Sequence, residues 1–181
     1  MSLANIRREY LGEPLSEVRS DPNPMRQFAH WFEQVRHTES DPTAMALATA
    51  SPDGRPSVRT VLLKGIDDRG YIFYTNYESR KAREMEATGR ASLLFFWPSV
   101  ERQVRIDGIV ERISPVESDA YFATRPLDSR LSVYASKQSE VVDSRDTLEL
   151  LFNAARERFE DTVPRPDWWG GYRVIPDEFE F

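Results

Sequence analysis

The sequence predicts an α+β fold, mainly β, in which antiparallel strands form a barrel with peripheral helices. Apolar, β-rich runs separated by turn signals occupy the middle of the chain, and helical patterns lie before, between and after them. The chain of 181 residues has the size of one domain, and its apolar fraction of 40% is sufficient for a core. We expect residues 1–22 to form a polar N-terminal arm and residues 23–181 to form this domain.

The first helix is predicted over NPMRQFAHWFEQV, with Asn23 as the N-cap and Pro24 at the first helical position. The helical period places four apolar side chains on one face: Met25, Phe28, Phe32 and Val35. His30 and His37 lie off this stripe, so we expect both to be exposed.

The strands begin at Thr43. TAMALATA, PSVRTVLLKG and YIFYTN are separated by the turn signals SPDG and DDRG, which predicts successive hairpins. ASLLFFW and RQVRIDGIVERI are two further strands, and the tail WWGGYRVIPDEFEF predicts a Gly-Gly turn followed by a strand.

Helices are predicted between and after these strands. SRKAREMEA is a short helix, and SPVESDAYFATRP is a helix that ends at Pro126. The clearest helical pattern is DTLELLFNAARERF, in which five apolar residues share one face: Leu148, Leu151, Phe152, Ala155 and Phe159.

Composition excludes several classes of function. With 24 Lys and Arg against 30 Asp and Glu, the formal net charge is -6, which disfavours nucleic-acid binding but allows a local cationic pocket for a small anion. The absence of cysteine excludes disulfides, thiol nucleophiles and iron–sulfur clusters, and two histidines without a carboxylate motif do not indicate a metal site.

The same sequence indicates a cytoplasmic protein. The start MSLANIRREYLGEPL has no apolar segment of the kind found in signal peptides. The longest strongly apolar run, SLLFFW, is far shorter than the roughly 20 residues that a membrane-spanning helix needs.

Cations gather where a short helix begins after a hairpin. Ser79 is the expected N-cap, and Arg80 and Lys81 occupy the first turn, where the helix dipole favours acids by about 0.3–1 kcal/mol each. An anion docked on the free N–H groups would make these cations favourable, so the three residues form a candidate phosphate clamp. The alternative is a solvated basic helix end.

Three further groups carry candidate binding chemistry. Strand alternation places Arg59 and Lys64 on opposite faces unless the strand is interrupted, and both could instead be strand-end charges that reach water. Gln103 could hydrogen-bond the edge of a heteroaromatic ring, or lie on an outer strand face. Tyr121 and Arg125 share a helix face, and with Ser129 they could bind a second phosphate; otherwise Arg125 only complements a helix C-terminus.

These motifs together, in one order, resemble the pyridoxamine 5′-phosphate oxidase family. The order is RREY, DPTAM, R-x-VLLK, FYTN-x-x-SRK, LLFFW, RQVRIDG, YFATRP-x-DS, SKQS and VPRP-x-WWGGYRV, from about Arg7 to Phe181. The resemblance implies an FMN-binding split barrel that acts as a homodimer, with two flavin sites between the subunits.

The resemblance also implies the site residues. The FMN contacts would be Arg59, Thr60, Val61, Leu62, Leu63, Lys64, Tyr74, Thr75, Ser79, Arg80, Lys81, Gln103, Gln138 and Ser139. The substrate contacts would be Lys64, Tyr121, Arg125 and Ser129, and an N-terminal segment that can cover the active site would be Arg7, Arg8, Glu9 and Tyr10.

The implied reaction is oxidation of pyridoxamine 5′-phosphate or pyridoxine 5′-phosphate to pyridoxal 5′-phosphate. Hydride passes from the C4′ carbon to flavin N5, the amine product hydrolyses with release of ammonia, and O2 reoxidises the flavin to give H2O2. The flavin carries the redox chemistry, so no residue is expected to be catalytic in its own right, although Lys64 would lie near both flavin and substrate.

The sequence departs from the family pattern at its end. It stops at DEFEF, where the family continues with a Trp-Gln pair, an Arg-Leu-His-Asp-Arg motif and a last strand. We expect either a cut chain, a sequence restricted to ordered residues, or a naturally short protein in which FMN binding is weaker and oxidase activity much lower. The alternatives are another split-barrel oxidoreductase that uses FMN or a deazaflavin, and a non-catalytic FMN- or pyridoxal-phosphate-binding protein.

Overall fold

A computed structural model describes residues 3–7, 9 and 11–181 of the chain. Within this part, seven strands form one antiparallel sheet in the order β2-β1-β5-β6-β7-β4-β3. The strands are β1 (Ala44–Ala50), β2 (Pro56–Leu62), β3 (Gly65–Ile66), β4 (Tyr71–Asn76), β5 (Arg90–Trp97), β6 (Arg102–Arg112) and β7 (Trp169–Glu180). The helices are η1 (Glu17–Arg19), α1 (Pro24–Val35), α2 (Arg80–Thr88), α3 (Pro115–Thr124), α4 (Leu127–Ala135) and α5 (Arg145–Phe159).

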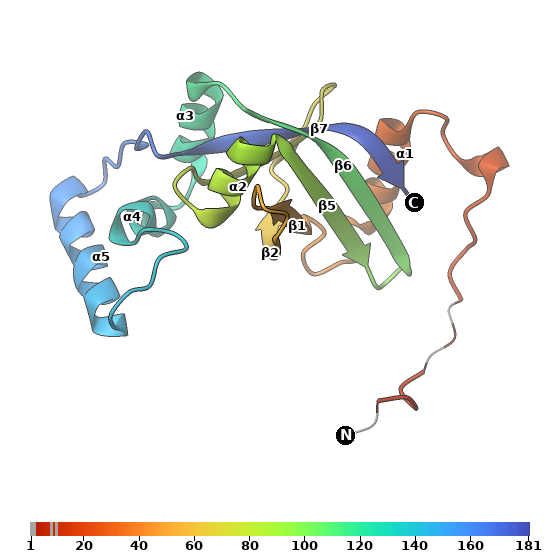
Figure 1. Cartoon of the computed structure of the whole chain (residues 1–181), viewed down its shortest axis with the longest axis horizontal. Coiled ribbons are helices and arrows are strands. Elements are labelled where there is room, and N and C mark those ends of the chain that lie inside the picture. The colour runs from red at the N-terminus through yellow and green to blue at the C-terminus, as the bar shows by residue number, and fades with distance from the viewer. Residues whose placement is uncertain (1–2, 8, 10) are drawn as a thin grey trace.

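The sheet curls into a half-barrel with helices around it, which confirms the predicted fold class. Strands β2 and β4 are far apart in the sheet order, yet they contact each other because the sheet curves. Figure 1 shows α1 near the C-terminal end of β7, and α4 with α5 at the opposite end of the molecule. Most of the described part of the N-terminal segment is exposed, although the N–H groups of Leu11 and Gly12 donate to the carboxylate of Glu101 in the turn between β5 and β6.

Helix α1 closes the concave side of the sheet, as its predicted apolar face requires. The side chain of Asn23 accepts hydrogen bonds from the N–H groups of Met25 and Arg26, which confirms the expected N-cap. Phe28 is fully buried and makes edge contacts with Tyr71 and Phe95, each with ring centroids 4.9 Å apart. His30 and His37 are exposed, as predicted.

A second, smaller core holds the helices at the other end. Its buried side chains come from α3, α4, α5, the segment after α5 and β7: Phe122, Leu131, Ala155, Val163 and Trp169. Helix α4 was not predicted, because Pro126 indicated only the end of the preceding helix; it also stands at the N-cap of α4. Leu148 and Leu151 on the predicted face of α5 are exposed, since α5 packs mainly on α4.

The Gly-Gly turn predicted in the tail is wrong. Gly170 and Gly171 lie inside β7 and pair with Thr75 and Tyr74 of β4. A Cβ atom at Gly170 would lie 2.1 Å from the hydroxyl oxygen of Tyr77. These glycines therefore allow neighbouring side chains to pack closely on β7, and they do not reverse the chain.

No helix among the described residues is long and apolar enough to cross a membrane. The same residues contain no group of three or more His, Asp or Glu side chains that could hold a metal ion.

Gly170→Ala should destabilise the fold, because its new methyl group collides with the ring of Tyr77. We expect a loss of about 1–3 kcal/mol, visible as a lower melting temperature. The matched control is Gly65→Ala, where the added Cβ meets only ordinary contacts of 3.5 Å or more with Ile72. Equal melting temperatures for the two variants would contradict the close packing at Gly170.

Candidate functional site

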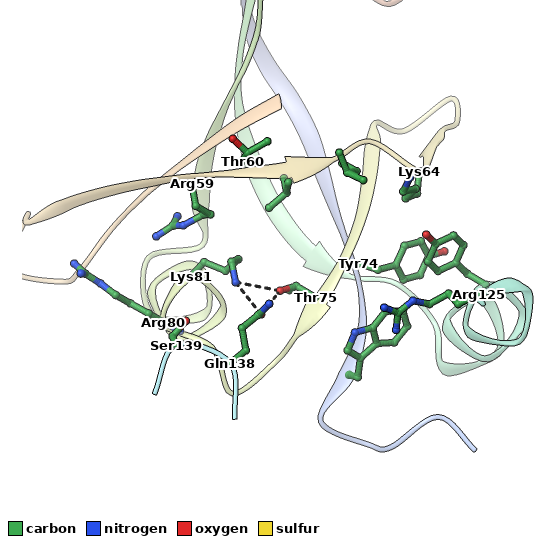
Figure 2. A pocket seen from close by; sticks show the side chains of 14 residues that line it. Arg59, Thr60, Lys64, Tyr74, Thr75, Arg80, Lys81, Arg125, Gln138 and Ser139 are labelled. Atoms are coloured by element: carbon green, nitrogen blue, oxygen red, sulfur yellow. Dashed lines mark hydrogen bonds between the residues drawn. The ribbon is translucent and has the colours of Figure 1, made fainter. Parts of the chain in front are cut away.

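The main pocket lies where the curled sheet brings β2 and β4 together, next to the N-terminus of α2. Its volume is about 560 Å³, within the range usual for small-molecule sites. Figure 2 shows side chains from β2, β4, α2, α3 and the segment after α4 around this space. The lining residues are Arg59, Thr60, Val61, Leu62, Lys64, Tyr74, Thr75, Arg80, Lys81, Tyr121, Arg125, Gln138, Ser139 and Trp169.

The pocket is cationic although the chain is acidic. Five of the lining residues carry a positive charge: Arg59, Lys64, Arg80, Lys81 and Arg125. None of the lining residues identified in the described structure is acidic. Arg59, Arg80 and Lys81 lie at one end in Figure 2, and Lys64 and Arg125 lie at the other. Such a site favours a ligand with negative charge at two separate places.

Arg59 and Lys64 reach the same pocket because β2 ends between them. Inside β2 the alternation holds as predicted: Ser57, Arg59 and Val61 are half-buried, whereas Val58 and Thr60 are exposed. The strand stops at Leu62, and the N–H of Lys64 donates to the carbonyl of Ile72 in the next hairpin strand. The interruption removes the strict alternation that would have separated the two cations.

Lys81 is the most buried cation of the pocket. It is 6% exposed, and its Nζ donates to Oε1 of Gln138 at 2.9 Å, to Oγ of Ser79 at 3.2 Å and to Oγ1 of Thr75 at 3.3 Å. Burial, with repulsion from Arg59, lowers the pKa of Lys81 to about 8. A charged ammonium held by three neutral acceptors is suited to receive an anion.

Helix α2 begins with the N-cap and the two cations that the sequence predicts. Ser79 is the N-cap, but its side chain makes no capping bond within the helix. Arg80 and Lys81 are in the first turn, and no acid is there. The N–H of Arg80 is bound by Oγ of Ser139 at 3.2 Å, so the segment after α4 closes over this helix end.

Stacked aromatic rings form the other end of the pocket. The rings of Tyr74 and Tyr121 are 3.8 Å apart and nearly parallel, and Trp169 is stacked 5.5 Å from Tyr74. The guanidinium of Arg125 lies 4.7 Å from the centre of the Trp169 ring. Burial raises the pKa of Tyr74 to about 12, so its hydroxyl remains protonated at neutral pH.

Arg125 has unused binding capacity. Its Nη1 is buried and has no hydrogen-bond partner within the described part of the chain, and burial lowers the pKa of the side chain. Leaving such a charged donor unpaired is costly, so an anionic group at this place would stabilise it.

Most of the predicted site residues line one pocket. Those that do are Arg59, Thr60, Val61, Leu62, Lys64, Tyr74, Thr75, Arg80, Lys81, Tyr121, Arg125, Gln138 and Ser139. Leu63 is instead buried in the main core, and Ser79 lies beneath Lys81 with no exposed surface. Ser129 is at the start of α4, outside the lining.

Gln103 and the N-terminal arm lie elsewhere. Gln103 is exposed on the outer face of β6, opposite Phe96, and does not line this chain's own pocket. Arg7 and Glu9 are exposed, while Arg8 and Tyr10 fall outside the described residues.

One lining residue, Trp169, was not predicted from the sequence, although it stands in the motif WWGGYRV. The available signal was an aromatic residue directly before paired glycines.

Comparisons with known proteins find similar sequences and folds. The sequence model of the family described as pyridoxamine 5′-phosphate oxidase matches residues 32–159. A pyridoxine/pyridoxamine 5′-phosphate oxidase of Rubrobacter xylanophilus is 56% identical over 181 residues, covering 99% of this chain and 83% of that protein. The protein of the same name in Cupriavidus taiwanensis is 53% identical over 180 residues, covering 99% and 85%.

Solved structures share the fold. PhzG from Burkholderia lata 383, in complex with tetrahydrophenazine-1-carboxylic acid, superposes with a TM-score of 0.87 at 33% identity, over 93% of this chain and 85% of PhzG. An FMN-binding protein of Nostoc punctiforme PCC 73102, related to pyridoxamine 5′-phosphate oxidase, gives a TM-score of 0.69 at 18% identity, over 92% and 84%. This second likeness supports the fold alone.

Binding of a dianionic phosphate ligand in this pocket should depend on pH through Lys81. A bound dianion raises the pKa of the ammonium above its free value of about 8, so affinity should fall as pH rises through 8, by at most about 10-fold per pH unit. Titrations of FMN between pH 7 and 10 measure this slope. Lys81→Arg keeps its charge throughout, so it should bind FMN with a flat profile; an identical slope in both proteins would exclude Lys81 as the cause.

Proposed function

This chain belongs to the pyridoxamine 5′-phosphate oxidase family, and from that premise we propose that it oxidises pyridoxamine 5′-phosphate and pyridoxine 5′-phosphate to pyridoxal 5′-phosphate. FMN is the proposed cofactor and O2 the proposed electron acceptor. The observation that carries the proposal is the separation of two cationic ends within one pocket, with aromatic rings beside one of them.

The residues present fit FMN. Arg59, Arg80 and Lys81 would hold its phosphate, with Ser139 and the N-terminus of α2 beside them. The ring system would lie toward Lys64 and Tyr74. When bound, FMN supplies the redox chemistry, since it can accept a hydride from the substrate and pass electrons to O2.

The chain's own residues bind and orient the substrate. The unpaired Nη1 of Arg125 would bind the substrate's phosphate, and the protonated hydroxyl of Tyr121, which lines the same pocket, would donate to it. Tyr74 and Trp169 stack with the ring of Tyr121, which would restrict the position of the substrate bound there.

A second candidate substrate follows from the similarity to PhzG. That structure holds a tetrahydrophenazine carboxylic acid, and Arg125 would pair with a carboxylate by the same charge-assisted bonds as with a phosphate. The reaction class, a flavin-dependent oxidation of an anionic heteroaromatic compound, is the same for both.

A flavin spectrum tests the function. Protein loaded with FMN should lose its flavin absorption when pyridoxine 5′-phosphate is added without oxygen, and should release H2O2 when air is admitted. Arg125→Ala should keep FMN but raise KM for the phosphorylated substrate by about 10- to 100-fold, the loss of a charge-assisted contact.

Controls separate the candidate substrates. Pyridoxine without phosphate should react equally poorly with the wild type and with Arg125→Ala, because it lacks the group that Arg125 binds. Bleaching by tetrahydrophenazine-1-carboxylic acid but not by pyridoxine 5′-phosphate would replace the first substrate with the second. A flavin that neither compound reduces would contradict the oxidase function.

We propose in addition that two copies associate through the outer face of the sheet. Large apolar side chains are exposed there on β2, β5 and β6: Val58, Leu62, Phe96 and Ile109. Gln103 lies on the same face, paired with Phe96, and points away from its own pocket. In a dimer it would reach the flavin of the other subunit, which fits its predicted role.

Phe96→Glu should convert the dimer to a monomer, because it places a charge in the apolar interface. Light scattering on the loaded protein measures the mass. The control Val116→Glu changes a residue of α3 that is more exposed than Phe96 and does not belong to this sheet face, and it should remain dimeric. A monomeric wild type that still binds FMN would contradict association through this face.

A further inference from the structure

A buried carboxylate lies beneath the cationic end of the pocket. Glu84 of α2 is 5% exposed and does not itself line the pocket. Its Oε1 accepts a hydrogen bond from Nε of Arg80 at 2.7 Å. Its Oε2 accepts from the hydroxyls of Thr49 and Ser57, each at 2.5 Å, and lies 3.5 Å from Nη2 of Arg59.

Besides the direct contact of 3.5 Å, the hydroxyls of Thr49 and Ser57 link Glu84 to Arg59 through hydrogen bonds. Nη1 of Arg59 donates to Oγ1 of Thr49, and Nη2 donates to Oγ of Ser57, both at 2.6 Å. An ionised carboxylate can only accept, so both hydroxyls give their protons to Glu84 and present lone pairs to the guanidinium. Glu84 therefore holds Arg80 directly and Arg59 through this relay.

The carboxylate is ionised across the working range of pH. Burial by itself raises the pKa of Glu84, but hydrogen bonds from Ser57, Thr49 and Arg80 outweigh it and lower the pKa to about 2. A carboxyl group with a depressed pKa stabilises the folded state above its unfolded pKa, and loses that effect only as pH falls toward 2. The relay is thus intact at neutral pH.

Helix stability does not account for this arrangement. In the pair Arg80–Glu84 the cation precedes the acid by four residues, which is the less favourable order on a helix. Burial of a carboxylate also costs free energy that an apolar residue of similar size would not. The network is better suited to holding two cations in place than to stabilising α2.

We propose that Glu84 is a positioning residue for the phosphate of FMN. It holds the guanidinium groups of Arg59 and Arg80 at one end of the pocket despite their mutual repulsion, and it engages Arg80 through Nε. This inference rests on the proposed binding of FMN and adds a residue that does not touch the cofactor.

If Glu84 acted only through its charge, its removal would change FMN affinity in the opposite direction from that expected for a positioning residue. Removing a negative charge near a dianionic phosphate should strengthen its binding. Glu84→Gln has nearly the same shape, but its amide nitrogen is a donor and must face either Arg80 or the two hydroxyls, which also donate. Positioning therefore predicts weaker binding, and the sign of the change distinguishes the two.

The test compares FMN with riboflavin, which lacks the phosphate. Glu84→Gln should bind FMN about 10-fold more weakly by fluorescence titration, the cost of misaligned charge-assisted bonds, and riboflavin within about two-fold of the wild type. The matched control is Glu86→Gln on the same helix, whose carboxylate binds Arg112 and Tyr172 outside the pocket. It should leave the affinity for both ligands unchanged.

A second variant tests the relay. Ser57→Ala keeps the carboxylate but removes one hydroxyl between it and Arg59, so FMN should bind about three-fold more weakly and riboflavin equally well. In an Arg80→Ala background, Glu84→Gln should weaken FMN binding less than in the wild type, since one of its two targets is gone.

The outcomes are distinct. Equal or tighter FMN binding by Glu84→Gln would overturn the positioning role and leave the proposed function standing. Equal weakening of FMN and riboflavin would show a structural role and overturn it as well. If the wild-type protein binds riboflavin and FMN with equal affinity, both the proposed FMN phosphate site and this inference would be overturned.

Discussion

Repulsion among the cations at the start of α2 is the constraint on which the rest of the site depends. Arg59 and Lys81 face each other closely enough for that repulsion to contribute to the lowered pKa of Lys81, and Arg80 acts on Arg59 in the same way. The protein offsets this cost with neutral acceptors around Lys81 and with the buried carboxylate of Glu84. Such an arrangement stores unfavourable electrostatic energy that a bound dianion would release.

Curvature of the sheet brings the cations to the aromatic rings. Strands β2 and β4 come from distant places in the sheet order, and their contact places Arg59 across the pocket from Tyr74. Gly170 and Gly171 leave room for Tyr77 and Ile113 to pack directly on the backbone of β7 where it pairs with β4. Trp169, the residue before these glycines, is thereby placed beside Tyr74 and Arg125.

The two faces of the sheet have different tasks. The inner face carries the core that α1 covers, including Phe28 and Phe95. The outer face exposes Phe96 and Gln103 side by side, an apolar residue and a carboxamide next to each other. In the dimer proposed above, the inner face would carry the cationic cluster and the outer face would contact the second copy.

The sequence by itself determined the local features of this protein. Turn signals, strand alternation and the N-caps at Asn23 and Ser79 depend on neighbouring residues, so they could be predicted, as could most of the pocket lining once the motif order was recognised. The course of β7 through its glycines, helix α4, the role of Trp169 and the network under Glu84 were decided by tertiary structure. Each depends on contacts between residues far apart in the chain, such as Glu84 with Thr49 or Gly170 with Tyr77, and no local pattern encodes which distant side chain will arrive there.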